Sequence, residues 1–169
     1  IVGTSTKTGS SARGVFLAGY TASPYATAIL IQSTSTTGGG VEISGTTNGD
    51  QAIQIAHSSA TAINTQILSQ NGPININGTG GSTDLFLSTD VTIGARKAST
   101  PINGIVPGVS TSSSNITLKG DVINVTTGCG FNTTGTVDIL SNSNSFSGAI
   151  TVDSKWDFAS TNSGLTIGK

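Results

Sequence analysis

The sequence predicts an all-β fold in which short strands stack into a β-solenoid. Branched apolar residues recur in pairs separated by one residue and bounded by Gly, Ser, Thr or Asn, as in Ile74/Ile76 and Ile116/Leu118. Because side chains alternate faces along a strand, the many copies indicate one continuous apolar wall. The chain also contains 23 glycines among its 169 residues. Frequent Gly, together with Thr, Val and Ile in the periodic stretches, disfavours helices and favours strands joined by tight turns.

The expected strands follow one another along the whole chain. They cover residues 14–18, 26–32, 41–44, 52–56, 63–69, 74–77, 84–88, 91–94, 115–119, 122–126, 136–140, 149–153, 156–159 and 165–168. The centres Ile43, Ile55 and Ile67 are spaced so that two or three strands fit within a coil of about 20 to 24 residues, which predicts about seven coils. A β-sandwich has similar strand spacing and is the alternative, but its usual central aromatic residue is missing, since the one tryptophan, Trp156, lies near the end.

Residues 1–169 are expected to form a single solenoid segment that is part of a longer chain or fibre. The ends of a solenoid expose unpaired strand edges, and no charged cap is visible in the sequence, so neighbouring coils are implied. Residues 96–114 interrupt the strand rhythm with Pro101 and Pro107. We interpret them as a loop excursion that could carry a partner-specific surface, with a plain long connection as the alternative.

Composition narrows the classes of function. Charged residues make up 9% of the chain, against roughly a quarter in ordinary domains, and the net charge is −1 without a basic cluster. Nucleic acid is therefore not an expected partner, because nothing would neutralise its phosphates. The surface must consist of hydroxyls and amides, which indicates a secreted or cell-surface location. No apolar run is long enough to span a membrane as a helix.

Catalytic chemistry is not expected. The acids are scattered, and residues such as Asp84, Asp121 and Asp153 lie at strand edges, where Asp commonly caps turns. The only histidine, His57, has no partner motif, and the single cysteine, Cys129, is expected to be buried. The sequence therefore predicts a protein that is not an enzyme and that has no cofactor and no metal site.

Two sets of residues are candidates for surface chemistry. Four Asn-x-Thr sequons allow glycosylation at Asn77, Asn115, Asn124 and Asn132. The alternative is that Asn and Thr stack at turns and bond to neighbouring coils. Trp156 and Phe158 offer the one aromatic surface for a carbohydrate contact.

Three segments resemble the repeats of filamentous-haemagglutinin-type bacterial exoproteins. They are Gly-Gly-Val41-Glu-Ile-Ser-Gly-Thr46, Asn71-Gly-Pro-Ile-Asn-Ile-Asn-Gly78 and Asn115-Ile-Thr-Leu-Lys-Gly-Asp-Val122. The resemblance implies a right-handed parallel β-helix, secreted by a two-partner or autotransporter route and displayed as a fibre shaft. The amino-terminal secretion domain of that family is not visible in the sequence, and the resemblance identifies no site residue.

The expected function is a structural and adhesive segment of such a surface fibre, acting in adhesion, aggregation or biofilm formation. Its partners would be flanking coils of the same chain or identical subunits, and host or neighbouring-cell surfaces, including glycans. The alternatives are a self-assembling extracellular filament subunit and a β-helix that binds or cleaves carbohydrate.

Overall fold

The computed structural model describes residues 1–19, 29–57, 65–88, 90–96, 107–126 and 128–168. In these residues the structure contains three parallel sheets and no helix. Sheet A consists, in spatial order, of β1 (Val2–Ser5), β4 (Val41–Thr47), β7 (Ile74–Thr79), β10 (Ile116–Lys119), β13 (Thr136–Leu140) and β15 (Gly164–Gly168). Sheet B consists of β2 (Arg13–Gly19), β5 (Gln51–His57), β8 (Thr83–Ser88) and β11 (Ile123–Val125). Sheet C consists of β3 (Leu30–Ser33), β6 (Thr65–Ser69), β9 (Val91–Gly94), β12 (Cys129–Asn132) and β14 (Trp156–Phe158).

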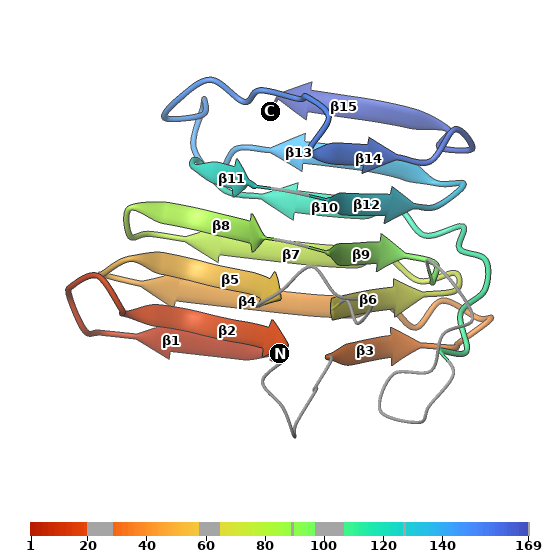
Figure 1. The fold of residues 1–169 in the computed structure, drawn as a ribbon, viewed down its shortest axis with the longest axis horizontal. Coiled ribbons are helices and arrows are strands. Elements are labelled where there is room, and N and C mark those ends of the chain that lie inside the picture. The colour runs from red at the N-terminus through yellow and green to blue at the C-terminus, as the bar shows by residue number, and fades with distance from the viewer. Residues whose placement is uncertain (20–28, 58–64, 89, 97–106, 127, 169) are drawn as a thin grey trace.

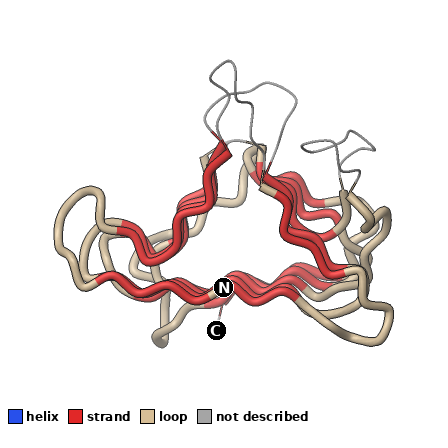
Figure 2. The backbone as a smooth tube through the Cα atoms, turned by 90° about the horizontal axis from the view of Figure 1, so that it is seen from below, coloured by secondary structure: helices blue, strands red, loops and turns tan. Residues whose placement is uncertain are grey.

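The chain visits sheets A, B and C in turn and then starts the next coil on top of the last (Figure 1). Viewed along the stack from the β1 end, sheet A is the base of a triangle, and sheets B and C are its other two sides (Figure 2). Every pairing between neighbouring coils is parallel, as in β4 with β7 and β7 with β10. The predicted β-solenoid is therefore confirmed.

The core consists of ladders of aligned apolar side chains. In sheet A, Ile43, Ile76, Leu118 and Ile139 occupy equivalent positions in four successive strands, and all four are fully buried. The alternation recognised in the sequence produces these ladders, because every second residue of each strand points into the triangle. Each ladder residue is thus covered from above and below by residues of its own kind.

The prediction of about seven coils is not confirmed, because the largest sheet holds six strands. The coil that begins at β10 is short, since Ile116 pairs with Val137. The two coils before it are longer, because Val41 pairs with Ile74, and Ile74 in turn pairs with Ile116. The predicted number of coils came from the spacing between alternate strands, which assumes two strands per coil. A full coil of the structure has three strands and often a long segment at a corner, so the chain forms fewer coils.

A column of glycines closes the corner between sheets A and B. Gly3, Gly45 and Gly78 are aligned in β1, β4 and β7. A Cβ atom on Gly78 would lie closer than 3.0 Å to the backbone of Asp84 at the start of sheet B, and one on Gly45 would meet Ala52 in the same way. Only glycine allows the two sheets to approach so closely at this corner.

Buried hydroxyls hold the corner between sheets C and A. Ser114 Oγ donates to the carbonyl oxygen of Ser69 in the coil below at 2.9 Å, and Thr133 Oγ1 donates to the carbonyl oxygen of Ser114 at 2.7 Å. All three residues are buried. These bonds satisfy backbone carbonyls where the chain leaves the sheet ladder, and they connect three successive coils.

The predicted excursion at 96–114 is described only in part, because residues 97–106 lie outside the described residues. Residues 107–114 return along the outside of sheet C, where buried Val109 packs against Leu68 and Ala95. Arg96 Nη1 donates to the carbonyl oxygen of Pro107 at 2.9 Å, and Gly108 N–H donates to Gln32 Oε1 at 3.0 Å. The described part is therefore packed against the solenoid.

Some predicted strands differ from the observed ones. The expected strands at 26–32 and 63–69 lie partly outside the described residues, and their described parts belong to β3 and β6. Residues 149–153, expected to be a strand, are an irregular segment. Strands β1 and β12 were not predicted, because Gly3 and Gly130 interrupt their apolar alternation.

Candidate functional site

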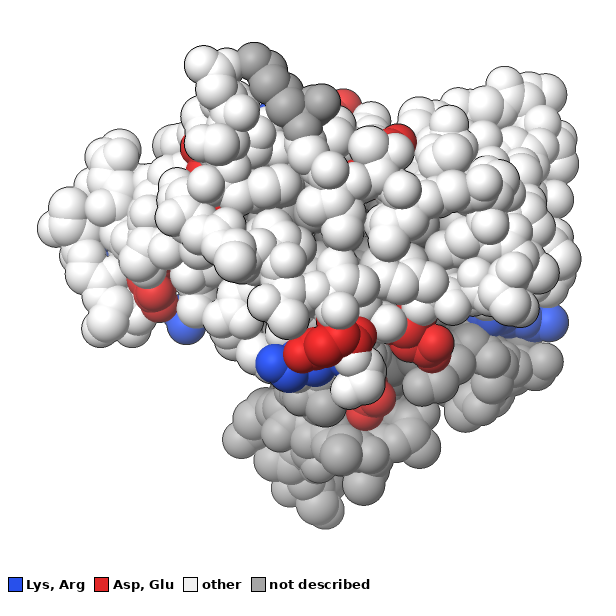
Figure 3. Space-filling view, turned by 90° about the horizontal axis from the view of Figure 1, so that it is seen from above, with Lys and Arg blue, Asp and Glu red and all other residues white. Residues whose placement is uncertain are grey.

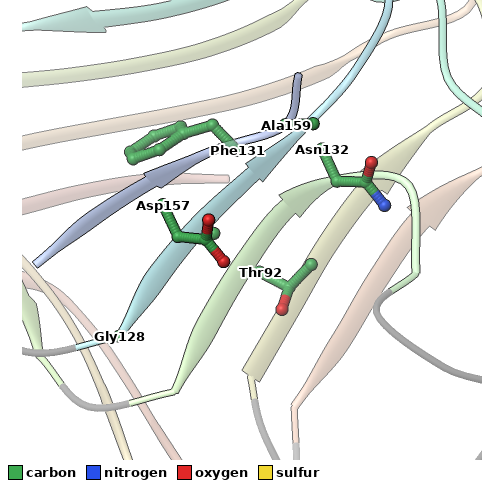
Figure 4. Close-up of a pocket in the computed structure, with 7 residues that line it drawn as sticks. Thr92, Gly128, Phe131, Asn132, Asp157 and Ala159 are labelled. Atoms are coloured by element: carbon green, nitrogen blue, oxygen red, sulfur yellow. The ribbon is translucent and has the colours of Figure 1, made fainter. Parts of the chain in front are cut away.

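A recess lies on the outer face of sheet C, above Gly130. In β12, Gly130 pairs with Thr92 of β9 on one side and with Asp157 of β14 on the other. Because Gly130 has no side chain, the outward row of side chains is interrupted between these two neighbours. The resulting recess has a volume of about 200 Å³ and is lined by Thr92, Gly128, Gly130, Phe131, Asn132, Asp157 and Ala159 (Figure 4).

The polar lining of the recess comes from three neighbouring strands. Asp157 is exposed and Thr92 is buried beside the glycine. Asn132 is half-buried, and its Nδ2 donates to the carbonyl oxygens of Ala95 and Arg96 at 3.5 and 3.4 Å. The Asp157 carboxylate and the Asn132 amide can exchange hydrogen bonds with a hydroxylated ligand such as a sugar.

The recess does not contain the pair of acids that glycoside hydrolysis commonly uses. Asp157 is the one carboxylate among the residues that line it. Canonical glycosidases need one carboxyl group as acid and a second as base or nucleophile. No group of three or more His, Cys, Asp or Glu side chains in the described part of the chain could hold a metal ion. The residues that line the recess therefore do not supply the carboxylate pair of canonical glycosidases.

Two of the other acids hold corners of the solenoid, as expected for Asp at strand edges. Asp84 is buried, and its Oδ2 accepts hydrogen bonds from the backbone N–H groups of Asp121 and Val122 in the next coil. Asp121 Oδ1 accepts the N–H of Ser143 at 2.8 Å, one coil further on. This backbone hydrogen bond lowers the pKa of the Asp121 carboxyl.

Trp156 and Phe158, the predicted carbohydrate contact, belong to the inner face of sheet C. Trp156 is 6% exposed, and its Nε1 donates to the carbonyl oxygen of Thr151 at 3.1 Å. Phe158 is half-buried and stacks on the fully buried Phe131, with 5.1 Å between ring centroids. The two side chains lie together and extend the core, and the carbohydrate contact stays a prediction.

The four sequon asparagines are spread over different parts of the solenoid. Asn124 is exposed on β11, and Asn115 is exposed and accepts the N–H of Thr136 in the next coil at 3.1 Å. Asn77 is half-buried, with an Oδ1 that has no hydrogen-bond partner among the described residues, and Asn132 lines the recess. The bond from Asn115 is of the coil-to-coil type that the alternative interpretation expected, and glycosylation stays a prediction.

Cys129 is buried on the inner face of β12 next to the aromatic residues. Burial raises the pKa of its thiol to about 12, so the reactive thiolate is suppressed at neutral pH. The side chain of His57 lies outside the described residues.

The sequence identified Asn132 as a glycosylation candidate and not as part of a recess. It did not identify Thr92, Gly130 or Asp157. The available signal was Gly130 itself, which stands at an outward position between the inward residues Cys129 and Phe131. A glycine at such a position leaves a gap in the outer surface of a sheet. Its neighbours across the sheet could not be identified, because they depend on the lengths of the coils above and below.

Comparisons with family models, with curated proteins and with solved structures found no match for this chain. Within the described residues, no helix is long and apolar enough to cross a membrane.

Proposed function

We propose that this chain is a structural and adhesive segment of a secreted bacterial surface fibre. The observation that carries the proposal is the pair of uncovered edges of sheet A. β1 and β15 are the two outermost strands of this sheet, and among the described residues each has a neighbouring strand on one side alone. Leu165 and Ile167 of β15 continue the ladders of Val137 and Ile139, yet each is 46% exposed, whereas Val137 and Ile139 are fully buried.

A further parallel coil would cover these positions and extend the same ladders. At the other end of the stack, Ile1 precedes β1 in register with the inward Ile43 and is also exposed. Exposed strand edges with apolar side chains favour pairing with further strands, and solenoids use this stacking to build long rods. The proposed role is therefore to supply length and stiffness, while the outward faces make contacts.

The outward surface fits a contact role more than a catalytic one. Charged residues make up 9% of the chain, and the β15 end of the stack is covered mainly by uncharged residues (Figure 3). A surface of hydroxyls and amides presents many donors and acceptors, which suits contact with glycans or with other hydroxyl-rich surfaces. The chain's resemblance to haemagglutinin-type repeats supports the same role.

Electron microscopy of the native material, combined with intact-mass spectrometry, tests the proposal. Rods formed by a chain many times heavier than the 16.8 kDa described here would support a segment of a large exoprotein. Fibres assembled from chains of this mass would instead support the self-assembling filament subunit. Short particles that never extend beyond one solenoid segment would contradict both roles.

The recess above Gly130 supports carbohydrate binding as a second candidate function. A glycan array with the wild-type protein and the Gly130→Val variant tests it directly. A Cβ on Gly130 would have a single atom within 4 Å, the carbonyl oxygen of Val91 at 4.0 Å, so a valine side chain can stand on the floor of the recess with little strain. Gly164→Val is the matched control, since Gly164 is also a strand glycine with space for a Cβ. Binding that survives Gly130→Val would exclude the recess as the site.

A further inference from the structure

Sheet B ends one coil earlier than its neighbours. Its last strand is β11, whereas sheet C continues to β14 and sheet A to β15. Residues 141–155 connect β13 to β14 at this level without forming a strand. The outer edge of β11 therefore lies open on the side where a fifth strand of sheet B would be.

The open edge presents backbone groups that no strand of the described chain receives. Leu85 N–H donates to the carbonyl oxygen of Val122 at 3.1 Å, and Thr126 N–H donates to that of Leu87 at 3.0 Å. In a parallel ladder, alternate residues direct their N–H and C=O groups to opposite neighbours, so Ile123 and Val125 direct theirs away from β8. A cavity of about 400 Å³ runs along this edge, between residues 122–125 and a segment that includes Ala149, Thr151 and Asp153.

The sequence beyond the cavity repeats β11 in register. Ile150-Thr151-Val152 has the same apolar-polar-apolar pattern as Ile123-Asn124-Val125. In the adjacent sheet, Cys129 of β12 pairs with Trp156 of β14, and the step along the chain from Cys129 to Trp156 equals the step from Ile123 to Ile150. A strand at 150–152 would therefore place Ile150 on Ile123 and Val152 on Val125 without any change in the register of the coil.

In the structure, residues 149–153 lie beside the position that a fifth strand of sheet B would occupy. Ile150 is half-buried against the core, whereas Val152 is 39% exposed. Ser147 N–H donates to the carbonyl oxygen of Asp121 at 2.9 Å and fixes one end of the segment. At the other end, the Trp156 indole holds the carbonyl oxygen of Thr151.

We propose that residues 149–153 dock on β11 as the fifth strand of sheet B. Docking closes the cavity, turns Val152 into the core beside Val125 and pairs the free backbone groups of β11. It also completes a three-strand coil at the β15 end, which gives a further coil a continuous surface on which to stack. The segment is thus a strap that exchanges between an open and a paired arrangement, whatever the outer faces of the solenoid bind.

Disulfide trapping tests the proposed register. Asn124 and Thr151 point outward in the docked arrangement and become direct neighbours, with a Cα–Cα distance of about 4.8 Å that suits a disulfide. The double variant Asn124→Cys/Thr151→Cys is made in a Cys129→Ser background and oxidised under mild conditions. The control pair Asn124→Cys/Asp153→Cys is displaced by one full strand period, which puts the Cα atoms about 8 Å apart. We expect the first pair to cross-link at least about tenfold faster, since the second exceeds disulfide geometry.

A third variant separates docking from simple proximity. Adding Val152→Asp to the first pair would place a carboxylate in the core on docking, whereas in the open arrangement residue 152 stays partly in water. Cross-linking should then slow by at least about tenfold. Equal rates for the two cysteine pairs, no cross-linking of either pair, or no effect of Val152→Asp would each overturn the proposal. Thermal melting of every variant verifies that the solenoid remains folded.

Discussion

Gly78→Ala tests the close approach of sheets A and B. A Cβ at this position would lie 2.7 Å from the carbonyl carbon of Asp84 and 2.8 Å from Cδ2 of Leu85, with the Asp84 oxygen closer still. The Leu85 side chain can rotate, but the Asp84 carbonyl belongs to the backbone of β8. The substitution must therefore push the start of β8 away from sheet A.

The displacement sets the expected cost. Ordinary carbon–carbon contacts have separations of about 3.5 to 4.0 Å, so the Asp84 backbone must retreat by about 1 Å. Overpacking of this kind typically costs about 1–3 kcal/mol, and a clash with backbone belongs at the upper end. We expect a loss of about 3 kcal/mol in the free energy of unfolding. For a chain of this size, that corresponds to a fall in Tm of about 6–12 °C.

Urea and thermal unfolding, followed by circular dichroism, measure this loss against Gly148→Ala. A Cβ on Gly148 would meet nothing within 4 Å, so this control removes the same backbone freedom without a clash. It should change stability by no more than about 1 kcal/mol, in the stabilising direction. If Gly78→Ala has the same Tm as the control, the aligned glycines are not needed for the corner and the argument from close packing fails.

Three further predictions concern the ladder and the titrating groups. Ile76→Ala should destabilise by about 2–5 kcal/mol and Ile167→Ala by about 1 kcal/mol, because these equivalent ladder positions are 0% and 46% exposed; equal losses in urea unfolding would contradict the stacked core. Iodoacetamide should label Cys129 about a hundredfold more slowly in the folded chain at pH 8 than in urea, and equal labelling would show that the thiol is accessible. Because the folded pKa of this thiol is raised to about 12, its contribution to stability should decline above about pH 9. The Asp121 carboxyl has a lowered pKa, so its contribution to stability is present above its unfolded pKa and disappears as the pH falls through the folded pKa. Asp121→Asn should therefore flatten the acid limb of a plot of stability against pH. An unchanged slope would rule out the hydrogen bond from Ser143 as the cause of this acid dependence.

The architecture could be predicted because its signal is local. Alternation within a strand needs no knowledge of the rest of the chain, so the ladder residues Ile74, Ile76, Ile116 and Leu118 were identified from the sequence. The number of strands in a coil is not local, because it depends on which strand returns to which. The predicted coil length came from the spacing between alternate strands, that is, from two strands per coil. This spacing is close to the length of the shortest observed coil, in which Ile116 pairs with Val137, but that coil contains three strands.

The recess could not be predicted for the same reason. Thr92, Gly130 and Asp157 are neighbours because two connections of different length return the chain to the same place, the first from β9 to β12 and the second from β12 to β14. Neither length follows from a motif. The inward position of Trp156 was equally hidden, since an aromatic residue near the end of a solenoid can cover the core or face outward, and the register with Cys129 decides between the two.

Coil length and ladder register are independent in this molecule, and this independence determines where function can vary. The inward residues must match those above and below, so changes there cost packing energy, as the fully buried Ile76 illustrates. Outward positions of the strands have no such partner requirement, because a side chain there extends away from the stack. The recess at Gly130 lies at a position of this freer kind, whereas Ile150 and Val152 of the segment 149–153 must match β11 when they dock. Substitutions that alter binding without loss of stability should therefore be found on the outer face of sheet C.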